Sequence, residues 1–426
     1  MVCRCHFFCL WPILLFAFLS LGNVFFRNLK HSYFYQLNVT HLETESNLRV
    51  SAALDFFSSS TTRNTFLQTK SESKVKICVG ILTVTRPERY LIQTAHAILK
   101  YITSKERGQI YLIAINGNKN TGEEQPSDLN LISSYFDDIL LSPTAMQNTR
   151  KHSSNLNMDY AKALRHCASK VPQPPYTLII EDDALAAPFF FSHVTKAIDL
   201  VQRKGEKLHD SSYLDFFTMK LYSSEFYFGW ELSLGDVSLL VALAIILSTI
   251  AVTTLVVGLK KIRRSGYRPN VNFRKKKNIT KLHFYRIFIN FWGAFVFFIC
   301  TLLCLGKQNI FHPYSINGIH SFHQNTIDSG TLATLFQTKN NILLAESIEK
   351  ITIEESYQPI DLLISNWAVK NNRQRLYYIP SLFQHIGLWS TSEYKRFAQK
   401  RHLKLGHQIL NYKSSDSFER YFSMKS

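Results

Sequence analysis

Residues 176–184 read Tyr-Thr-Leu-Ile-Ile-Glu-Asp-Asp-Ala, a short apolar run that ends in three consecutive carboxylates. The run is rich in β-favouring residues and too short for a helix, so it predicts a buried strand. In open α/β sheets, ligands bind beyond the carboxyl ends of the strands. Glu181, Asp182 and Asp183 would repel one another there unless a cation or hydrogen-bond donors neutralised them. A divalent ion held against a phosphate is one interpretation, and a solvated acidic turn is the other.

The stretches on either side of this strand predict the rest of an α/β fold. Residues 75–85 and 110–115 are apolar runs typical of buried strands, and the segment between them has helical spacing. Strand, helix, strand is the opening of a parallel sheet flanked by helices. Further strands are predicted at 139–141, 213–222, 331–337 and 375–380, and helices at 87–101, 159–170, 189–201 and 361–369.

Two apolar segments, residues 237–259 and 288–305, are predicted to cross a membrane as helices. The stretch between them, residues 260–286, contains eleven Lys and Arg residues and no acidic residue. By the positive-inside rule this loop belongs in the cytosol, so its sequon at Asn278 should stay unmodified. A hairpin with a cytosolic tip returns the chain to the side it left. Residues 27–235 and 306–426 are therefore predicted to share the lumen and to form one interrupted domain.

An N-terminal apolar segment, residues 7–26, has about the length needed to span a bilayer. It lacks an obvious small-residue cleavage site, which favours an uncleaved anchor over a cleavable signal peptide. The polar residues that follow predict a loosely ordered stem, in which Asn38 begins a glycosylation sequon. The predicted organisation is an anchor at 1–30, a luminal stem at 31–73, a first domain part at 74–235, the hairpin at 236–306 and a second domain part at 307–426.

The formal net charge of +18 does not indicate nucleic-acid binding, because much of the positive charge lies in the loop between the two membrane segments. Of the seven cysteines, only Cys78 and Cys167 fall within the predicted domain, so the chain is not a disulfide scaffold. The sequence leaves open whether these two cysteines pair.

Residues 150–161, followed by the acid-tipped strand at 176–183, resemble the centre of GT-A glycosyltransferases, with Glu-Asp-Asp in place of Asp-x-Asp. The spacing is similar to that of the N-acetylglucosaminyltransferase IV family. With its membrane hairpin, the chain resembles the family of Golgi post-GPI-attachment factors that transfer N-acetylgalactosamine to the mannose core of glycosylphosphatidylinositol (GPI). This resemblance implies a GT-A-like mixed sheet, UDP-GalNAc as donor, Mn²⁺ or Mg²⁺ as cofactor, and a multi-pass Golgi membrane protein with a luminal catalytic domain.

The resemblance also implies roles for individual residues. Asp183, together with Asp182, and His385 would hold the metal across the donor diphosphate. In the alternative, Glu181 or Asp182 would contact the ribose. Asp361 resembles the catalytic base of inverting members, which deprotonates the acceptor hydroxyl. Alternatives for the base are Glu354 and Glu355, and the remaining predicted nucleotide-sugar contacts are Thr85, Arg86, Arg150 and Asp159.

Other interpretations remain open. His385 would otherwise be structural, Asp361 would stabilise a helix N-terminus, and Arg150 with Asp159 would form a salt bridge. The alternative functions are an N-acetylglucosaminyltransferase IV-like enzyme acting on N-glycans and a catalytically silent glycolipid-binding membrane protein. A channel or transporter is disfavoured because none of the three apolar segments carries the carboxylate or cationic side chain expected of an ion path. The expected partners are GPI-anchored proteins as acceptors and membrane lipid, with no nucleic acid.

Overall fold

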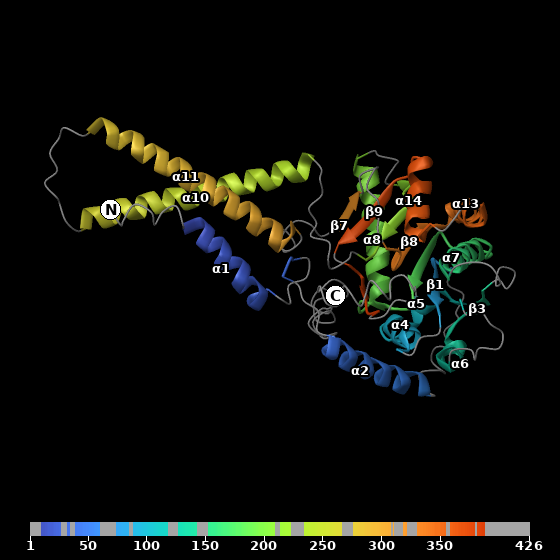
Figure 1. Cartoon of the computed structure of the whole chain (residues 1–426). Helices are drawn as coiled ribbons and strands as arrows, with labels where there is room; N and C mark the ends of the chain where they lie inside the picture. Colours follow the sequence, from blue (N-terminus) through green and yellow to red (C-terminus); the bar gives the residue numbers. More distant parts are fainter. Residues whose placement is uncertain are drawn as a thin grey trace. The chain divides into compact units, whose positions relative to one another are not determined.

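The computed structural model divides the chain into two compact units. The helical unit comprises residues 1–36 and 225–316, and the sheet unit comprises residues 37–224 and 317–426. Figure 1 shows the helices and strands of each unit. The described residues are 10–26, 32–34, 39–59, 74–84, 88–117, 127–142, 152–208, 214–222, 234–265, 276–307, 310, 318–321, 330–354, 358–379 and 381–387, some of them by their backbone alone.

The sheet unit is built on an eight-stranded sheet with the strand order β3-β2-β1-β4-β8-β6-β9-β7. In its parallel half, β1 (Ile77–Thr83) lies between β2 (Ile110–Asn116) and β4 (Tyr176–Glu181), and β3 (Asp138–Leu141) follows β2. β8 (Ala333–Gln337) runs antiparallel to β4. β1 is buried along its whole length, as expected of a central parallel strand covered on both faces. The predicted mixed α/β fold is thus confirmed.

Strands from before and after the membrane hairpin alternate in the other half of the sheet. β6 (Thr218–Lys220) precedes the hairpin and pairs antiparallel with β8 and parallel with β9 (Arg375–Ile379), which both follow it. β7 (Gly318–Ser321) runs antiparallel to β9. Strands of each segment thus complete the hydrogen bonding of the other within one sheet.

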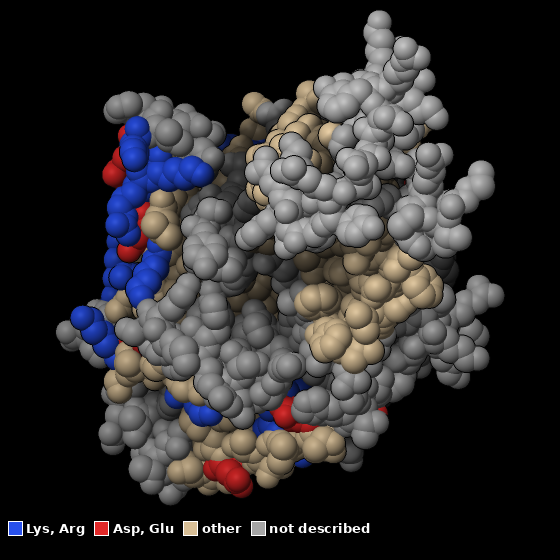
Figure 2. All heavy atoms as spheres, turned by 90° about the vertical axis from the view of Figure 1, so that its left-hand side faces the viewer, with Lys and Arg blue, Asp and Glu red and all other residues tan. Residues whose placement is uncertain are grey.

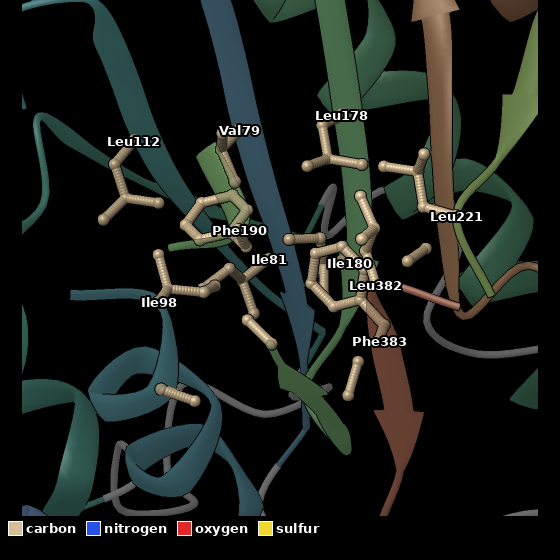
Figure 3. Packing of buried hydrophobic residues seen from close by; sticks show 14 of the residues in the cluster. Val79, Ile81, Ile98, Leu112, Leu178, Ile180, Phe190, Leu221, Leu382 and Phe383 are labelled. Atoms are coloured by element: carbon tan, nitrogen blue, oxygen red, sulfur yellow. The ribbon is translucent and has the colours of Figure 1, made fainter. Parts of the chain in front are cut away.

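Helices pack against the sheet and enclose two hydrophobic clusters. They are α4 (Tyr90–Leu99), α5 (Ser104–Arg107), α6 (Ser127–Ile132), α7 (His152–Ala168), α8 (Phe190–Leu208), α13 (Asn341–Glu354) and α14 (Ile360–Lys370), with 3-10 turns at Ser133–Tyr135 and Thr338–Asn340. Val79 and Ile81 of β1 join residues of α4 and α8 in one cluster, part of which Figure 3 shows. The alternate residues Cys78 and Leu82 join α7, α13 and α14 in the other, because successive side chains of a strand face opposite sides.

A disulfide bond joins Cys78 of β1 to Cys167 of α7. Both cysteines are fully buried within the second cluster. The bond ties a central strand to the helix that precedes β4 in the chain. The structure therefore answers the question that the sequence left open.

The largest difference from the sequence predictions lies in the stem. Residues 39–58 form helix α2 (Val39–Ser58) instead of a loosely ordered linker. Ala53 and Phe57 are buried in the core of the sheet unit, and Arg49 donates a hydrogen bond of 2.9 Å from Nε to Oε1 of Gln93 on α4. Tertiary packing stabilises this helix, and such packing is not visible in the local sequence.

The remaining differences concern where elements begin and end. α7 begins at His152, well before the predicted start at 159, and α4 is helical only from Tyr90. The extended segment predicted at 213–222 contributes the three residues of β6, with which β8 and β9 pair. His385, expected just after a strand, lies inside the short strand β10 (Phe383–His385). Strand ends are set by the pairing partners rather than by the strand's own composition.

The helical unit contains α1 (Leu10–Phe25), α10 (Leu234–Ser265) and α11 (Lys276–Leu305). Residues 234–258 and 287–305 are long and apolar enough to cross a membrane. Only 17% of the apolar stretch of each is buried, unlike a core helix of a soluble protein, so both present apolar surface suited to a bilayer. α1 is a shorter apolar helix of 16 residues. It packs on α11, where Nε1 of Trp11 donates to Oδ1 of Asn290 at 3.3 Å.

Candidate active site

Two of the three carboxylates at the end of β4 are buried, unlike most charged side chains. Charged side chains usually lie at the surface, as the Lys and Arg side chains along one edge of Figure 2 do. The side chains of Asp182 and Asp183 are instead buried, with exposed fractions of 1% and 5%. The interpretation as a solvated acidic turn is therefore wrong for these two residues. Because burying a carboxylate is costly without polar partners, the contacts of each acid indicate its role.

The turn that carries the acids is fixed by its backbone. The amide of Asp182 donates to the carbonyl of Leu82 at the end of β1, at 3.0 Å. The hydroxyl of Thr94 on α4 donates to the carbonyl of Asp182 at 2.5 Å. The amide of Ile386 donates to the carbonyl of Asp183 at 2.8 Å. Three elements distant in the chain thus hold the turn, which makes the position of both carboxylates well defined.

Asp183 faces His385. β5 (Ala184–Ala186) pairs antiparallel with β10, and this register places His385 opposite Ala184, next to the acid. Nε2 of His385 lies 3.2 Å from Oδ2 of Asp183. Gly387 closes the space beside them, because a Cβ there would come within 2.3 Å of Oδ2 of Asp183 and 2.9 Å of Nε2 of His385. His385 therefore lies at the acidic strand end.

Asp182 faces the end of β1. Its Oδ2 accepts hydrogen bonds from the Thr83 hydroxyl at 2.9 Å and from the Val84 amide at 3.2 Å. These donors stabilise a carboxylate within the protein. Of the three predicted metal ligands, the structure thus brings Asp183 and His385 together and turns the Asp182 carboxylate toward β1.

Glu181 and Asp361 both accept hydrogen bonds from the residues that lead into β8. The Thr331 hydroxyl donates to Oε1 of Glu181 at 2.7 Å. The amide of Gly330, the preceding residue, donates to Oδ2 of Asp361 at 3.0 Å, and Oδ1 of Asp361 accepts from the Leu362 amide at 3.0 Å. The candidate base at the start of α14 is therefore positioned at the same edge of the sheet as the acidic turn.

Asp159 lies on α7 beside the carboxyl ends of β1 and β2. A Cβ on Gly117 would come within 2.8 Å of Oδ2 of Asp159 and 3.3 Å of the Thr83 carbonyl, so the carboxylate and both strand ends are close. Asp159 is only 4% exposed, and its Oδ1 has no hydrogen-bond partner in the described part of the chain. Burial raises the pKa of Asp159 to about 6. An acceptor held so close to the strand ends is suited to contact a ligand.

Several predicted residues lie outside the described part of the chain, and several contributors were not predicted. Thr85, Arg86, Arg150 and the sequon residue Asn38 fall outside the described residues. The unpredicted contributors are Thr83, Gly330, Thr331 and Gly387. Thr83 and Thr331 are hydroxyl residues at or next to strand ends, a signal that the sequence does carry. Nothing in the local sequence of Gly387 indicates that it lies against Asp183.

The Asp183–His385 pair has the chemistry of part of a divalent-metal site. A carboxylate oxygen and an imidazole nitrogen are both common metal ligands, and the two atoms are 3.2 Å apart. Among the residues that the structure describes, no group of three or more His, Cys, Asp or Glu side chains is arranged to hold a metal. Two protein ligands fit a cation that is otherwise bound by substrate phosphate oxygens and water, as is usual for Mg²⁺.

Comparison with known proteins gives one match. A family model described as GPI-N-acetylgalactosamine transferase PGAP4 matches residues 77–384. The matched range runs from β1 to β10 and includes both hairpin helices, so it covers the interrupted sheet and the acidic strand end. A search of curated proteins finds no match.

Proposed function

The chain belongs to the GPI-N-acetylgalactosamine transferase PGAP4 family, whose model matches well over half of it, and from this membership we propose its reaction. The protein transfers N-acetylgalactosamine from UDP-GalNAc to the mannose core of GPI on GPI-anchored proteins. The reaction is metal-dependent and inverts the configuration of the sugar. The observation that carries the proposal is the contact of the buried Asp183, which follows β4, with His385 of β10.

The donor end of the site is formed by the acidic turn. Oδ2 of Asp183 and Nε2 of His385 would hold Mn²⁺ or Mg²⁺, which when bound offsets the charge that develops on the leaving diphosphate. Glu181, oriented by the Thr331 hydroxyl, would contact the ribose. Asp159 offers a buried acceptor near the ends of β1 and β2 for the nucleotide. Gly387 leaves room for the Asp183 carboxylate, which any side chain would displace.

Asp361 supplies the base for the acceptor. Its two carboxylate oxygens have about four lone-pair sites, and the described amides of Gly330 and Leu362 occupy only two of them. One site can therefore accept the proton of the mannose hydroxyl as that oxygen forms a bond to the anomeric carbon. The bond from the anomeric carbon to the UDP oxygen breaks at the same time. UDP leaves with the electron pair, and attack from the opposite face inverts the configuration.

We further propose that the sheet unit works in the Golgi lumen. The disulfide between Cys78 and Cys167 supports this location, because such bonds persist in oxidising compartments and are rare in the cytosol. The eleven basic residues at 260–286 support a cytosolic hairpin tip. A hairpin within the catalytic domain suits an acceptor whose sugar core stays near the bilayer.

The test is a transfer assay with full-length protein in detergent, UDP-GalNAc and a GPI acceptor, with and without Mn²⁺. We expect metal-dependent transfer that is lost in Asp183→Ala and strongly reduced in His385→Asn. His166→Asn is the matched control. His166 of α7 also pairs with an aspartate, Asp138, at 3.1 Å, but this aspartate lies on the edge strand β3. This control should keep full activity.

The same assay separates the alternative functions. Transfer from UDP-N-acetylglucosamine to an N-glycan acceptor would instead support an N-acetylglucosaminyltransferase IV-like enzyme. Binding of GPI by folded protein, with no transfer from any UDP-sugar, would support a catalytically silent binder. Inversion is checked by the anomeric configuration of the product, since a retained configuration would contradict the role given to Asp361.

A further inference from the structure

Helix α2, in the segment expected to be a loosely ordered stem, packs on the sheet unit through its apolar side chains. The ring centroid of Phe57 lies 5.0 Å from that of Tyr135, and the centroid of Phe56 lies 5.1 Å from that of His96 on α4. Ala53 is fully buried. Apolar contacts of this kind attach the helix to the core, and by themselves they indicate a contribution to stability alone.

The side chain of Gln93 on α4 makes a polar connection to α2. Its Oε1 accepts a hydrogen bond from Nε of Arg49 at 2.9 Å. Its Nε2 donates to Oγ of Ser46 and to the carbonyl of Glu88, both at 3.0 Å. The two hydrogens of this amide are thus both used. Because Gln93 is only 1% exposed, α2 fixes a buried side chain and, through it, the segment just before α4.

The next residue of α4, Thr94, holds the acidic turn. Successive residues of an α-helix are about 100° apart around its axis, so Gln93 and Thr94 face different partners. Thr94 is fully buried, and its hydroxyl donates to the carbonyl of Asp182 at 2.5 Å. Arg49 is therefore linked to the acidic turn through two adjacent residues of one helix. A shift of α4 would move the Asp182 carbonyl and, with it, the neighbouring Asp183.

We propose that α2 is a positioning element of the donor site, in which Arg49 acts through Gln93 and Thr94 on the acidic turn. This inference rests on the proposed function, because it concerns the binding of UDP and its metal at that turn. The described hydrogen bonds of Asp361 come from elsewhere, from the amides of Gly330 and Leu362. Loss of the Arg49 link should therefore weaken donor binding and leave acceptor binding unchanged.

Calorimetric binding of UDP in the presence of Mn²⁺, with full-length protein in detergent, tests this inference. Arg49→Met keeps an unbranched side chain but removes its donors. We expect it to raise the dissociation constant of UDP by about tenfold, the effect of losing one hydrogen bond to a charged group. Arg49→Lys retains a charged donor and should restore most of the affinity. Ser46→Ala removes the other α2 partner of Gln93 and, as a smaller change, should weaken UDP binding in the same direction. The KM for the GPI acceptor should stay at the wild-type value in all three variants.

Two further variants separate positioning from stability. Phe57→Leu loosens the packing of α2 about two turns beyond Arg49. It should lower the free energy of unfolding and leave the affinity for UDP unchanged. Thr94→Val removes the link from α4 to the acidic turn, so Arg49→Met added to Thr94→Val should weaken UDP binding no further.

Three results would overturn the inference. The first is wild-type affinity for UDP in both Arg49→Met and Ser46→Ala. The second is equal weakening in Phe57→Leu and Arg49→Met, which would show that α2 only stabilises the fold. The third is full additivity of Arg49→Met and Thr94→Val, since independent effects exclude a shared route. Wild-type protein that binds no UDP would instead contradict the proposed function itself.

Discussion

Replacing Gly387 by alanine tests the arrangement of Asp183 and His385 without removing either side chain. A methyl group there would lie 2.3 Å from Oδ2 of Asp183, whereas ordinary contact begins near 3.4 Å. The methyl and the carboxylate must therefore separate by about 1 Å, and the hydrogen bond of 2.8 Å from the Ile386 amide to the Asp183 carbonyl limits how far the backbone can move. A displacement of about 1 Å in an active site can cost about 100-fold in rate.

We therefore expect Gly387→Ala to lower the turnover of GalNAc transfer by about 100-fold and to raise the Mn²⁺ concentration needed for half-maximal activity. Overpacking should reduce the free energy of unfolding by about 1–3 kcal/mol. The assay is transfer to a GPI acceptor over a Mn²⁺ titration, with thermal unfolding in parallel. Gly205→Ala on α8 is the matched control, because its methyl would lie 2.7 Å from the side chain of Leu214. Equal activity and equal Mn²⁺ dependence in the two variants would refute the reasoning.

Three further predictions concern stability and topology. Because burial raises the pKa of Asp159 to about 6, the folded state holds this proton more tightly than the unfolded chain, so stability should fall as pH rises from about 4 to 6. Asp159→Asn should remove this pH dependence and raise the free energy of unfolding at neutral pH by up to about 3 kcal/mol. An unchanged pH dependence of thermal unfolding would contradict the assignment. Replacing Cys78 and Cys167 by serine should lower the free energy of unfolding by about 2–5 kcal/mol, measured by denaturation; stability equal to that of the wild type would argue against the bond. Asn38 should carry an N-glycan and Asn278 none. The shift in gel mobility on glycosidase treatment should therefore vanish in Asn38→Gln and persist in Asn278→Gln, and the reverse result would contradict the proposed topology.

The sequence by itself determined the class of the fold and predicted the edge of the sheet at which we propose that the chemistry takes place. The apolar runs predicted within 75–85, 110–115 and 176–184 contain β1, β2 and β4, because the hydrophobic pattern is a local property that can be read without knowledge of the pairing partners. The apolar segments predicted at 237–259 and 288–305 likewise lie in the helices α10 and α11. Glu181, which ends β4, and Asp182 and Asp183, which follow it, predicted the ligand edge, since ligands in such sheets bind beyond the carboxyl ends of the strands.

Only the tertiary structure decided which side chains meet at that edge. His385 and Asp183 are 202 residues apart in the chain, and the register of β10 on β5 brings them together. Asp182 turned toward Thr83 and not toward His385, although it is the neighbour of Asp183 in sequence. Stem residues 39–58 became a helix because Ala53 and Phe57 found a core to enter. Such contacts depend on strand register and on packing between distant segments, and neither is encoded in the local pattern of residues.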